Sequence, residues 1–318
     1  MTNKERYIQF CDKEALPLFL QPWWMDAVTE PDEKKWDVLL ACNKQGEIEA
    51  AMPFVTGSKL GMRYALTPQL TQYTGVWIKD KEGEDVTGRL SREKKLQNDI
   101  IEQLKALRIR YFDVKFPLSY TYWSPFYWAG YKQETHYTYR IEDMSNIDNV
   151  FARFDYAKQK QIRKAQNAGI TVDFDMTVDE LYDLQCTQLS VRGSKDYWSR
   201  VLVRSIMDHS RSRGQGLIVR AKDKDGNTHA AVGIVWDDHN AWEILSAIHP
   251  NYQTSGASTL VVWEAMQQAA QKTKAWDFEG SMIEGVENSF RQFGGVPTPY
   301  FEIKKYSKWI ELLLACRK

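Results

Sequence analysis

The chain has 318 residues, more than one hydrophobic core usually serves, so two domains of about 150 residues each are expected. Lys and Arg total 42, and Asp and Glu also total 42. With a net charge of zero, the protein has no overall positive electrostatic potential that would favour binding to DNA or to an anionic membrane. No stretch approaches the roughly 20 continuous apolar residues of a membrane helix, and MTNKERYIQF lacks the apolar region of a secretory signal. These features predict a cytoplasmic protein with no membrane insertion and no DNA partner.

The cysteines and histidines show no pattern of a metal site. Cys11, Cys42, Cys186 and Cys316 are far apart and have no C-x-x-C spacing, which favours reduced, packed thiols over a zinc site or disulfides. The five histidines do not cluster, and neither a Walker loop nor a Ser-His-Asp order is present. We therefore expect a function that needs no metal.

Two segments, one in each half of the chain, match each other at a constant offset. ACNKQGEIEAAMPFV starts at Ala41, and AKDKDGNTHAAVGIV starts at Ala221. Each has apolar, β-rich runs on either side of a polar turn with a glycine, where a positive φ is cheap, and so predicts a β-hairpin. The matched pairs are Ala41/Ala221, Gly46/Gly226, Ala50/Ala230, Ala51/Ala231 and Val55/Val235.

Further along the chain, the matches continue at a second, slightly smaller offset. An apolar face predicts a helix over roughly 94–107, and the strand Tyr111–Phe116 follows it. The second half predicts a helix over 257–272 and then the strand Ala275–Glu279. The shared order of elements indicates an internal duplication. The matched pairs are Ala106/Ala270, Asp113/Asp277, Phe126/Phe290 and Gly130/Gly294.

Three further helices are predicted between the halves. They are a basic helix over Asp155–Gly169, a helix over Thr177–Leu189 whose Thr177-x-x-Glu180 predicts a capping box, and a helix over 197–213. The prediction is an α/β fold of two tandem domains, with mixed sheets flanked by helices. We place the boundary near 145, which gives domains 1–145 and 146–318.

A loop of small residues follows a predicted strand and opens the helix at 257. Backbone N–H groups at the positive end of a helix bind phosphate or another anion, and a side chain at Gly256 would block close approach of a ligand. The alternative is that Ser255 or Ser258 only caps the helix. The first half has GRLSREKK at the corresponding place, without a small-residue loop. The candidate loop consists of Gln253, Thr254, Ser255, Gly256, Ala257 and Ser258.

The pattern Gln253-x-x-Gly256-x-Ser258 resembles the acyl-CoA pyrophosphate loop of the GNAT superfamily, Arg/Gln-x-x-Gly-x-Gly/Ala, with Ser258 departing at the last position. QIRKAQNAGITV (161–172), SGASTLVVWEAMQQA, WDFEGS (276–281) and SFRQFGG (289–295) resemble the double-GNAT proteins of the FemABX and BioF-like type. This resemblance implies two GNAT domains, of which the second carries the donor site while that of the first is degenerate.

The resemblance also implies an activity. We expect an N-acyltransferase that moves an acyl group from acyl-CoA, such as acetyl-CoA, directly to an amine of a small molecule or a cell-wall precursor. Well-known FemABX members take an amino acid from charged tRNA, so an aminoacyltransferase that uses aminoacyl-tRNA is the alternative, with tRNA not favoured by the neutral charge. A non-catalytic double-GNAT binding protein is the rival from another class.

Basic side chains on the helix at 155–169 are candidates for substrate contact. Lys160, Arg163 and Lys164, with Lys158 beside them, can hold phosphates, and the resemblance at QIRKAQNAG favours a substrate or tRNA contact. A solvated helix face is the alternative.

Four residues are candidates for catalysis. Glu279 stands near the carboxyl end of a predicted strand, where open α/β sheets bind ligands, and can take the amine proton. Glu243, on the preceding strand, is a second possible base. Arg291 can grip an anion or stabilise charge on the reacting carbonyl, with an ordinary surface arginine as the alternative. The resemblance to GNAT proteins makes Tyr300 a candidate proton donor.

Overall fold

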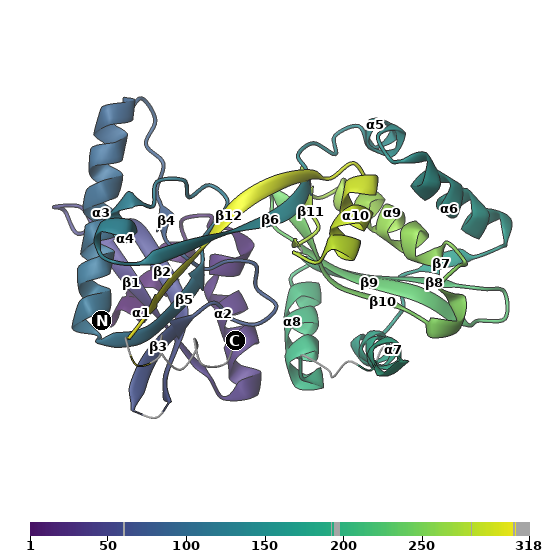
Figure 1. The fold of residues 1–318 in the computed structure, drawn as a ribbon, viewed down its shortest axis with the longest axis horizontal. Coiled ribbons are helices and arrows are strands. Elements are labelled where there is room, and N and C mark those ends of the chain that lie inside the picture. The colour runs from purple at the N-terminus through teal and green to yellow at the C-terminus, as the bar shows by residue number, and fades with distance from the viewer. Residues whose placement is uncertain (60, 192, 194–197, 281, 308, 310–318) are drawn as a thin grey trace. The chain divides into compact units, whose positions relative to one another are not determined.

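The computed structural model describes residues 1–59, 61–191, 193, 198–280, 282–307 and 309. The chain forms two compact units: unit 1 is Met1–His136 with the described residues from Pro299 onward, and unit 2 is Tyr137–Thr298. The sequence predicts one boundary near 145 with all later residues in the second domain, whereas in the structure the last strand continues into unit 1. Each unit has the predicted α/β architecture of a mixed sheet flanked by helices (Figure 1).

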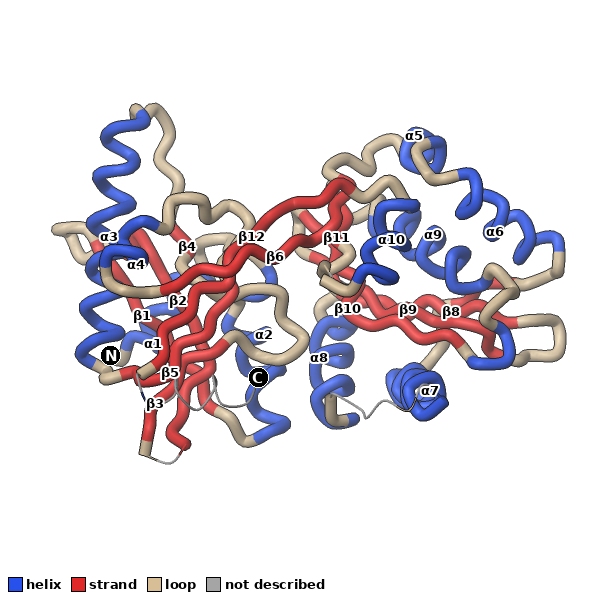
Figure 2. Tube along the Cα trace, in the orientation of Figure 1, coloured by secondary structure: helices blue, strands red, loops and turns tan. Residues whose placement is uncertain are grey.

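Unit 1 has helices on both faces of its sheet, whose strand order is β1-β2-β3-β5-β12-β6 with β4 beside β2 (Figure 2). Leu39 and Ala41 of β1 share a core with α3, while Trp36 of β1 contacts Tyr7 of α1 from the other face. The elements are α1 (Asn3–Cys11), α2 (Pro22–Thr29), β1 (Lys35–Cys42), β2 (Ile48–Lys59), β3 (Met62–Leu66), β4 (Trp77–Ile78), α3 (Val86–Ala106), β5 (Ile109–Lys115), α4 (Ser124–Trp128) and β6 (Lys132–Ile141), with short 3-10 turns at Leu18–Leu20 and Glu30–Asp32.

Unit 2 has the strand order β6-β11-β10-β9-β8-β7. Helix α9 packs on one face of this sheet, and α6 packs against α9. Helices α7 and α8 cover the other face (Figure 1). The elements are α5 (Ile147–Ala152), α6 (Tyr156–Asn167), β7 (Thr171–Asp173), α7 (Val178–Val191), α8 (Arg200–Ser212), β8 (Gly216–Lys222), β9 (Thr228–Trp236), β10 (Asn240–Ile248), a 3-10 turn (Pro250–Tyr252), α9 (Ala257–Ala269), β11 (Ala275–Asp277) and α10 (Glu284–Gln292), after which β12 (Val296–Tyr306) continues into unit 1.

The two predicted hairpins are present and have the same geometry. Ala41 faces Ala50 across β1 and β2, and Ala221 faces Ala230 across β8 and β9, with a register shift directly after each pair. The turn glycines, Gly46 and Gly226, have φ of 85° and 84°, as the sequence predicted for a positive φ. The first set of sequence matches therefore relates equivalent positions in space.

The second set of matches also relates structural equivalents, and it shows that the last strands are exchanged. Asp113 on β5 faces Lys304 of β12, and Asp277 on β11 faces Arg140 of β6. Arg140 and Lys304 are separated along the chain by the same offset as Asp113 and Asp277. Each unit therefore takes this strand from the other half of the sequence.

Several element boundaries differ from the predicted ones. Helix α3 begins at Val86 rather than near 94, because Asp85 caps it by accepting a hydrogen bond from Gly88 N at 2.8 Å. The segment GRLSREKK therefore lies inside α3. Because it is helical, the first half has no loop there that corresponds to residues 253–258. The predicted capping box is confirmed, since Thr177 Oγ1 accepts from Glu180 N at 3.2 Å and Glu180 Oε2 accepts from Thr177 N at 2.7 Å.

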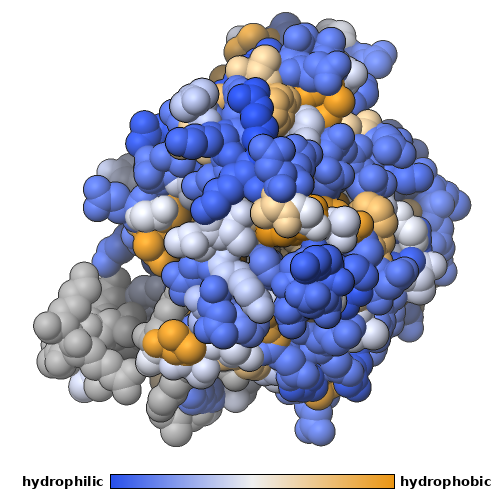
Figure 3. All heavy atoms as spheres, turned by 90° about the vertical axis from the view of Figure 1, so that its right-hand side faces the viewer, coloured by the Kyte–Doolittle hydropathy of each residue, from blue (hydrophilic) through white to orange (hydrophobic). Residues whose placement is uncertain are grey.

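Other features concern the cysteines and the surface. Cys11, Cys42 and Cys186 are free thiols of intermediate exposure, and Cys316 lies outside the described residues. Among the described residues, no helix is long and apolar enough to cross a membrane. The face drawn in Figure 3 is mostly hydrophilic, with small separate hydrophobic areas.

The strand exchange predicts where a mutation in β12 acts. Ile303, which is 0% exposed, lies in the core of unit 1. We expect Ile303→Ala to lower the free energy of unfolding by about 2–5 kcal/mol, because it leaves a cavity in that core. Hydrogen exchange should quicken in residues 35–115. Ile283→Ala, at a position 68% exposed, is the control. Faster exchange confined to residues 137–298 would contradict the exchange of strands.

Candidate functional site

A cavity of about 350 Å³ lies within unit 2. It is bounded by β9 and the carboxyl half of β10, by the first turns of α9, and by α6, α7 and α10. Its polar lining residues are Lys158, Gln188, Glu243, Ser246, Ser258, Thr259 and Ser289. Phe290 and Phe293 are among its apolar walls.

The cavity opens where two parallel strands stop pairing. β10 and β11 are paired only as far as Trp242 and Asp277, where β11 ends, while β10 continues to Ile248. Glu279 (φ 60°) and Gly280 (φ 79°) turn the chain away after β11. The edge of β10 that lies beyond Trp242 therefore loses its β11 partner, and side chains of α10 line the space beside it.

A β-bulge directs two polar side chains of β10 into this cavity. The register with β9 shifts between Glu243 and Leu245, which face Ile234 and Gly233. At the bulge, two residues of β10 lie opposite one residue of β9. Glu243 and Ser246 therefore point to the same face of the sheet although they are three residues apart in sequence. Both line the cavity.

Glu243 has an environment that favours its neutral form. Burial raises the pKa of its carboxyl to about 7, while Lys158 and Ser246 oppose the shift. Its Oε2 atom is shielded from solvent and has no hydrogen-bond partner among the described residues. A partly buried carboxyl with a pKa raised to about 7, and with one shielded oxygen left for a further partner, is suited to accept a proton from a ligand.

Lys158 of α6 is the second titratable group in the cavity, and its side chain is almost buried. It is 7% exposed, its Nζ donates to Ser289 Oγ at 2.8 Å, and Nζ lies 4.2 Å from the ring centroid of Phe293. Burial lowers the pKa of Lys158 to about 8, against the opposing effects of Glu243 and Asp155. Burial thus moves the pKa of the carboxyl up and the pKa of the amine down, both toward neutral pH.

The position of Lys158 in the sequence pattern of α6 indicates a buried lysine, although Lys158 is not among the predicted substrate-binding residues. Lys158, Ile162 and Ala165 form the buried face of α6 at spacings of four and three. A lysine on the apolar face of an amphipathic helix differs from the exposed cations around it, and that position marks it as a group with a special environment.

Gly256 has a structural requirement in addition to the ligand approach that the sequence suggested. It has φ 85° as the N-cap of α9, and a Cβ at this position would overlap the backbone carbonyl oxygen of Gln161 in α6. The contact with helix α6 is thus a structural requirement for Gly256, and close approach of a ligand at this position stays a prediction.

Several groups of the 253–258 loop already have partners within unit 2. Ser255 Oγ accepts from Ala257 N at 3.3 Å, although the N-cap of α9 is Gly256 and this N-cap has no side-chain cap hydrogen bond. Lys164 Nζ donates to the carbonyl oxygen of Thr254 at 2.5 Å. Gln253 is exposed, and Ser258 lines the cavity. The backbone N–H of Ser258, in the first helical turn, has no intrahelical acceptor and is the loop's clearest donor for a ligand.

The other predicted substrate contacts lie on the exposed face of α6. Lys160 and Arg163 are exposed, and Arg163 Nη2 donates to Gln159 Oε1 at 3.3 Å. Neither residue lines the cavity, whereas Lys164 is tied to the loop. The structure thus brings Lys164 to the loop and leaves Lys160 and Arg163 on a solvated surface.

Glu279 is not on a strand, because β11 ends two residues before it. Its backbone N donates to Asp277 Oδ1 at 2.7 Å, and Asp277, 0% exposed, also accepts from Thr138 and Arg140. Asp277 therefore holds the turn that Glu279 occupies. Glu279 is half-buried and is absent from the described lining of the cavity.

Arg291 and Tyr300 also lie outside the lining of the cavity. Arg291 is exposed on α10 and interacts with Glu287 at 3.3 Å and with Asn288 at 2.9 Å, both on its own helix. Tyr300 belongs to unit 1, where it is 6% exposed and its ring centroid lies 5.7 Å from that of His136. Of the four predicted catalytic residues, Glu243 lines the cavity, and Glu279, Arg291 and Tyr300 do not.

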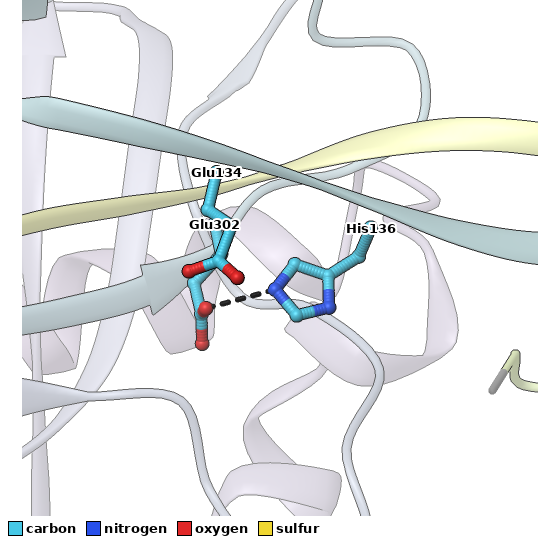
Figure 4. A group of neighbouring side chains, drawn as sticks. All are labelled: Glu134, His136 and Glu302. Atoms are coloured by element: carbon cyan, nitrogen blue, oxygen red, sulfur yellow. Dashed lines mark hydrogen bonds and ion pairs between the residues drawn. The ribbon is translucent and has the colours of Figure 1, made fainter. Parts of the chain in front are cut away.

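A group that resembles a metal site occurs in unit 1 (Figure 4). Glu134, His136 and Glu302 bring ligand atoms within 4.8 Å of one another, and His136 Nε2 lies 2.9 Å from Glu302 Oε2. Lys304 Nζ pairs with Glu134 at 2.7 Å and with Glu302 at 2.5 Å. A lysine cation already balances the carboxylates, so we interpret the group as an ion-pair network.

Comparisons with known proteins agree with this fold. Residues 152–278 match the family model of the acetyltransferase (GNAT) domain. The structure of FemX is similar with a TM-score of 0.69 and 11% identity, over 95% of this chain and 96% of that one. No curated protein sequence matches the chain.

Two further solved structures share the fold. The C-terminal domain of a putative lysylphosphatidylglycerol synthetase from Agrobacterium fabrum has a TM-score of 0.58 and 11% identity, over 98% of this chain and 96% of that one. A tandem GNAT protein from the clavulanic acid biosynthesis pathway has a TM-score of 0.54 and 11% identity, over 95% of this chain and 94% of that one. The chain therefore has the tandem GNAT fold of these structures, as predicted, and residues 152–278 correspond to the GNAT domain of the family model.

The contact between α6 and the loop predicts a difference between two glycines. Gly226→Ala should cost about 1–2 kcal/mol, since its φ is 84° and nothing lies within 4 Å of the added Cβ. Gly256→Ala should cost about 1–3 kcal/mol more, because the Cβ also displaces α6. Chemical denaturation of both variants measures the difference. Equal costs would mean that α6 does not constrain Gly256.

Proposed function

We propose that this protein is an N-acyltransferase that uses the cavity of unit 2 to transfer an acyl group from acyl-CoA directly to an amine. The observation that carries the proposal is Glu243: a shielded carboxyl with a pKa of about 7 faces a cavity at the first turn of α9. The GNAT-type domain at residues 152–278 supports the reaction class. Glu243 replaces Glu279 as the preferred base because the cavity contains Glu243.

The proposed chemistry needs a base and a group that stabilises negative charge. Acyl-CoA supplies a thioester carbonyl that an amine can attack, so that a C–N bond forms, the C–S bond breaks, and CoA leaves as a thiolate that takes up a proton to become the free thiol. Glu243, when ionised, accepts the proton that the amine loses on attack. Lys158, oriented by Ser289, supplies a positive charge in the same cavity, where low polarity strengthens its effect on a developing oxyanion.

The residues fit the acyl and amide part of the donor better than its pyrophosphate. The edge of β10 from Glu243 to Ile248 has no β11 partner, and of its backbone groups Ile248 N already donates to Gln188 Oε1 at 3.2 Å, so the groups before Ile248 can pair with an extended amide chain. At the loop, the Ser258 N–H and the Lys164 side chain are the groups nearest to the helix N-terminus that can meet an anion. Lys160 and Arg163 extend this positive surface along α6.

A second candidate is aminoacyl transfer. The likeness to FemX over 95% of this chain, and to the putative lysylphosphatidylglycerol synthetase domain over 98%, favours it. Amino acids and lipid or cell-wall precursors would then replace the acyl group and the small-molecule amine. The same base and the same cavity would serve, so the two candidates differ in the donor.

The proposed function predicts a specific loss of activity. Release of CoA from acetyl-CoA in the presence of primary amines (amino acids, aminosugars and diamines) should fall about 100- to 10,000-fold in Glu243→Gln. In the wild type, kcat/KM should rise with pH and level off near the pKa of about 7, since only the ionised carboxyl acts as a base.

Glu264→Gln is the matched control. Glu264 is half-buried on α9, burial raises its pKa, and it does not line the cavity, so its variant should keep full activity. Equal rates in wild type and Glu243→Gln would remove Glu243 as the base. Transfer from aminoacyl-tRNA, with none from acetyl-CoA, would establish the second candidate.

A further inference from the structure

A second cavity, of about 530 Å³, lies within unit 1 where β12 ends and β5 begins. Its walls carry the basic side chains of Arg110, Lys132, Lys304 and Lys305, and no acidic residue is among its described lining residues. Trp309, which is 77% exposed, also lines it. In a chain of formal charge zero, this cavity is a local concentration of positive charge.

The cations of this cavity are not equivalent. Lys304 is held by Glu134 and Glu302, so its charge is balanced within the protein. Arg110 is exposed, and no hydrogen bond or ion pair of its side chain is found among the described residues. The capacity to bind an anion therefore depends on the cations other than Lys304.

Lys305 is a partly buried cation whose contacts, within the described part of the chain, include no carboxylate. Its Nζ donates to the carbonyl oxygen of Ala129 at 2.6 Å and lies 4.6 Å from the ring centroid of Tyr131. Burial lowers the pKa of Lys305, and the nearby Lys105 lowers it further. A bound anion would relieve both effects, because it favours the charged amine.

The strand register directs Arg110 and Lys305 to the same side. Lys305 of β12 faces Phe112 of β5, and Arg110 is two residues from Phe112 on β5. Side chains two residues apart on a strand point to the same face, so Arg110, Phe112 and Lys305 share one face. Ser307 N donates to the carbonyl oxygen of Arg110 at 2.9 Å, which fixes the end of the strand pair there.

The internal duplication supplies a comparison within the same chain. Positions related by the Asp113/Asp277 offset are structural equivalents, so a need shared by both units would have kept the same residue types. Unit 2 instead has aliphatic residues at two of the three equivalent positions, so the positive cavity is particular to unit 1. The equivalents are Lys274 for Arg110, Ile141 for Lys305 and Val296 for Lys132.

We infer that this cavity binds a nucleoside phosphate, with Arg110 and Lys305 on the phosphate and Trp309 against the base. Arginine grips phosphate in two places, and an exposed indole offers a face on which a base can stack. A free nucleotide and the terminal nucleotide of an RNA present this same chemistry. The site is separate from the cavity of unit 2, so it does not depend on the proposed acyl transfer.

Isothermal titration calorimetry on the full chain tests this inference with AMP, inorganic phosphate and a four-nucleotide RNA at low salt. AMP or the RNA should bind, and Arg110→Gln or Lys305→Met should weaken binding about tenfold or more, the effect of losing one charge-assisted contact. Lys44→Met is the charge-matched control, since Lys44 is exposed on the β1–β2 turn of the same unit. Thermal unfolding confirms that each variant is folded.

The outcomes separate the possible sources. Binding of AMP supports a free nucleotide, and binding of the RNA without AMP supports an RNA end. Affinity for inorganic phosphate equal to that for AMP, or unchanged affinity in Trp309→Leu, would overturn the role of the base. No binding by any probe, or equal losses in Lys44→Met, would overturn the inference. Glu243→Gln should bind as the wild type does.

Discussion

The early end of strand β11 is the constraint on which the candidate site depends. β10 and β11 pair only up to Trp242 and Asp277, and the buried Asp277 holds the turn that follows by accepting from Glu279 N. Without that turn, β11 would continue beside β10 and fill the edge that now borders the cavity. The bulge at Glu243 then directs a carboxyl into the space. The position of the candidate base therefore depends on the backbone geometry of β10 and β11.

The polarity of this space depends on two buried groups. Glu243 and Lys158 each lose hydration, which shifts the pKa of the acid up and that of the base down, while their mutual attraction opposes both shifts. The remaining polar side chains of the cavity are hydroxyls and an amide. Such a site can exchange a proton near neutral pH, which is what amine acylation requires.

The sequence predicted the features that local patterns encode. Both hairpins, their glycines and the duplication follow from short matches, because turn geometry is local. The sequence did not predict the strand exchange, the bulge at Glu243 or the contact of Gly256 with Gln161, since each depends on which distant segments meet. Glu243 was one of four catalytic candidates that the sequence offered, whereas Lys158 was named only beside the predicted phosphate contacts, and its place on the apolar face of α6 was the signal for a buried position.

The acyl donor is proposed to bind beside the free edge of β10. Hydrogen–deuterium exchange of the full chain with and without acetyl-CoA tests this most directly, because it reports on backbone N–H groups one segment at a time. We expect slower exchange in residues 243–248 and 256–260, with unit 1 unchanged in residues 35–115. Protection confined to unit 1, or no protection at saturating acetyl-CoA, would contradict the proposed donor site.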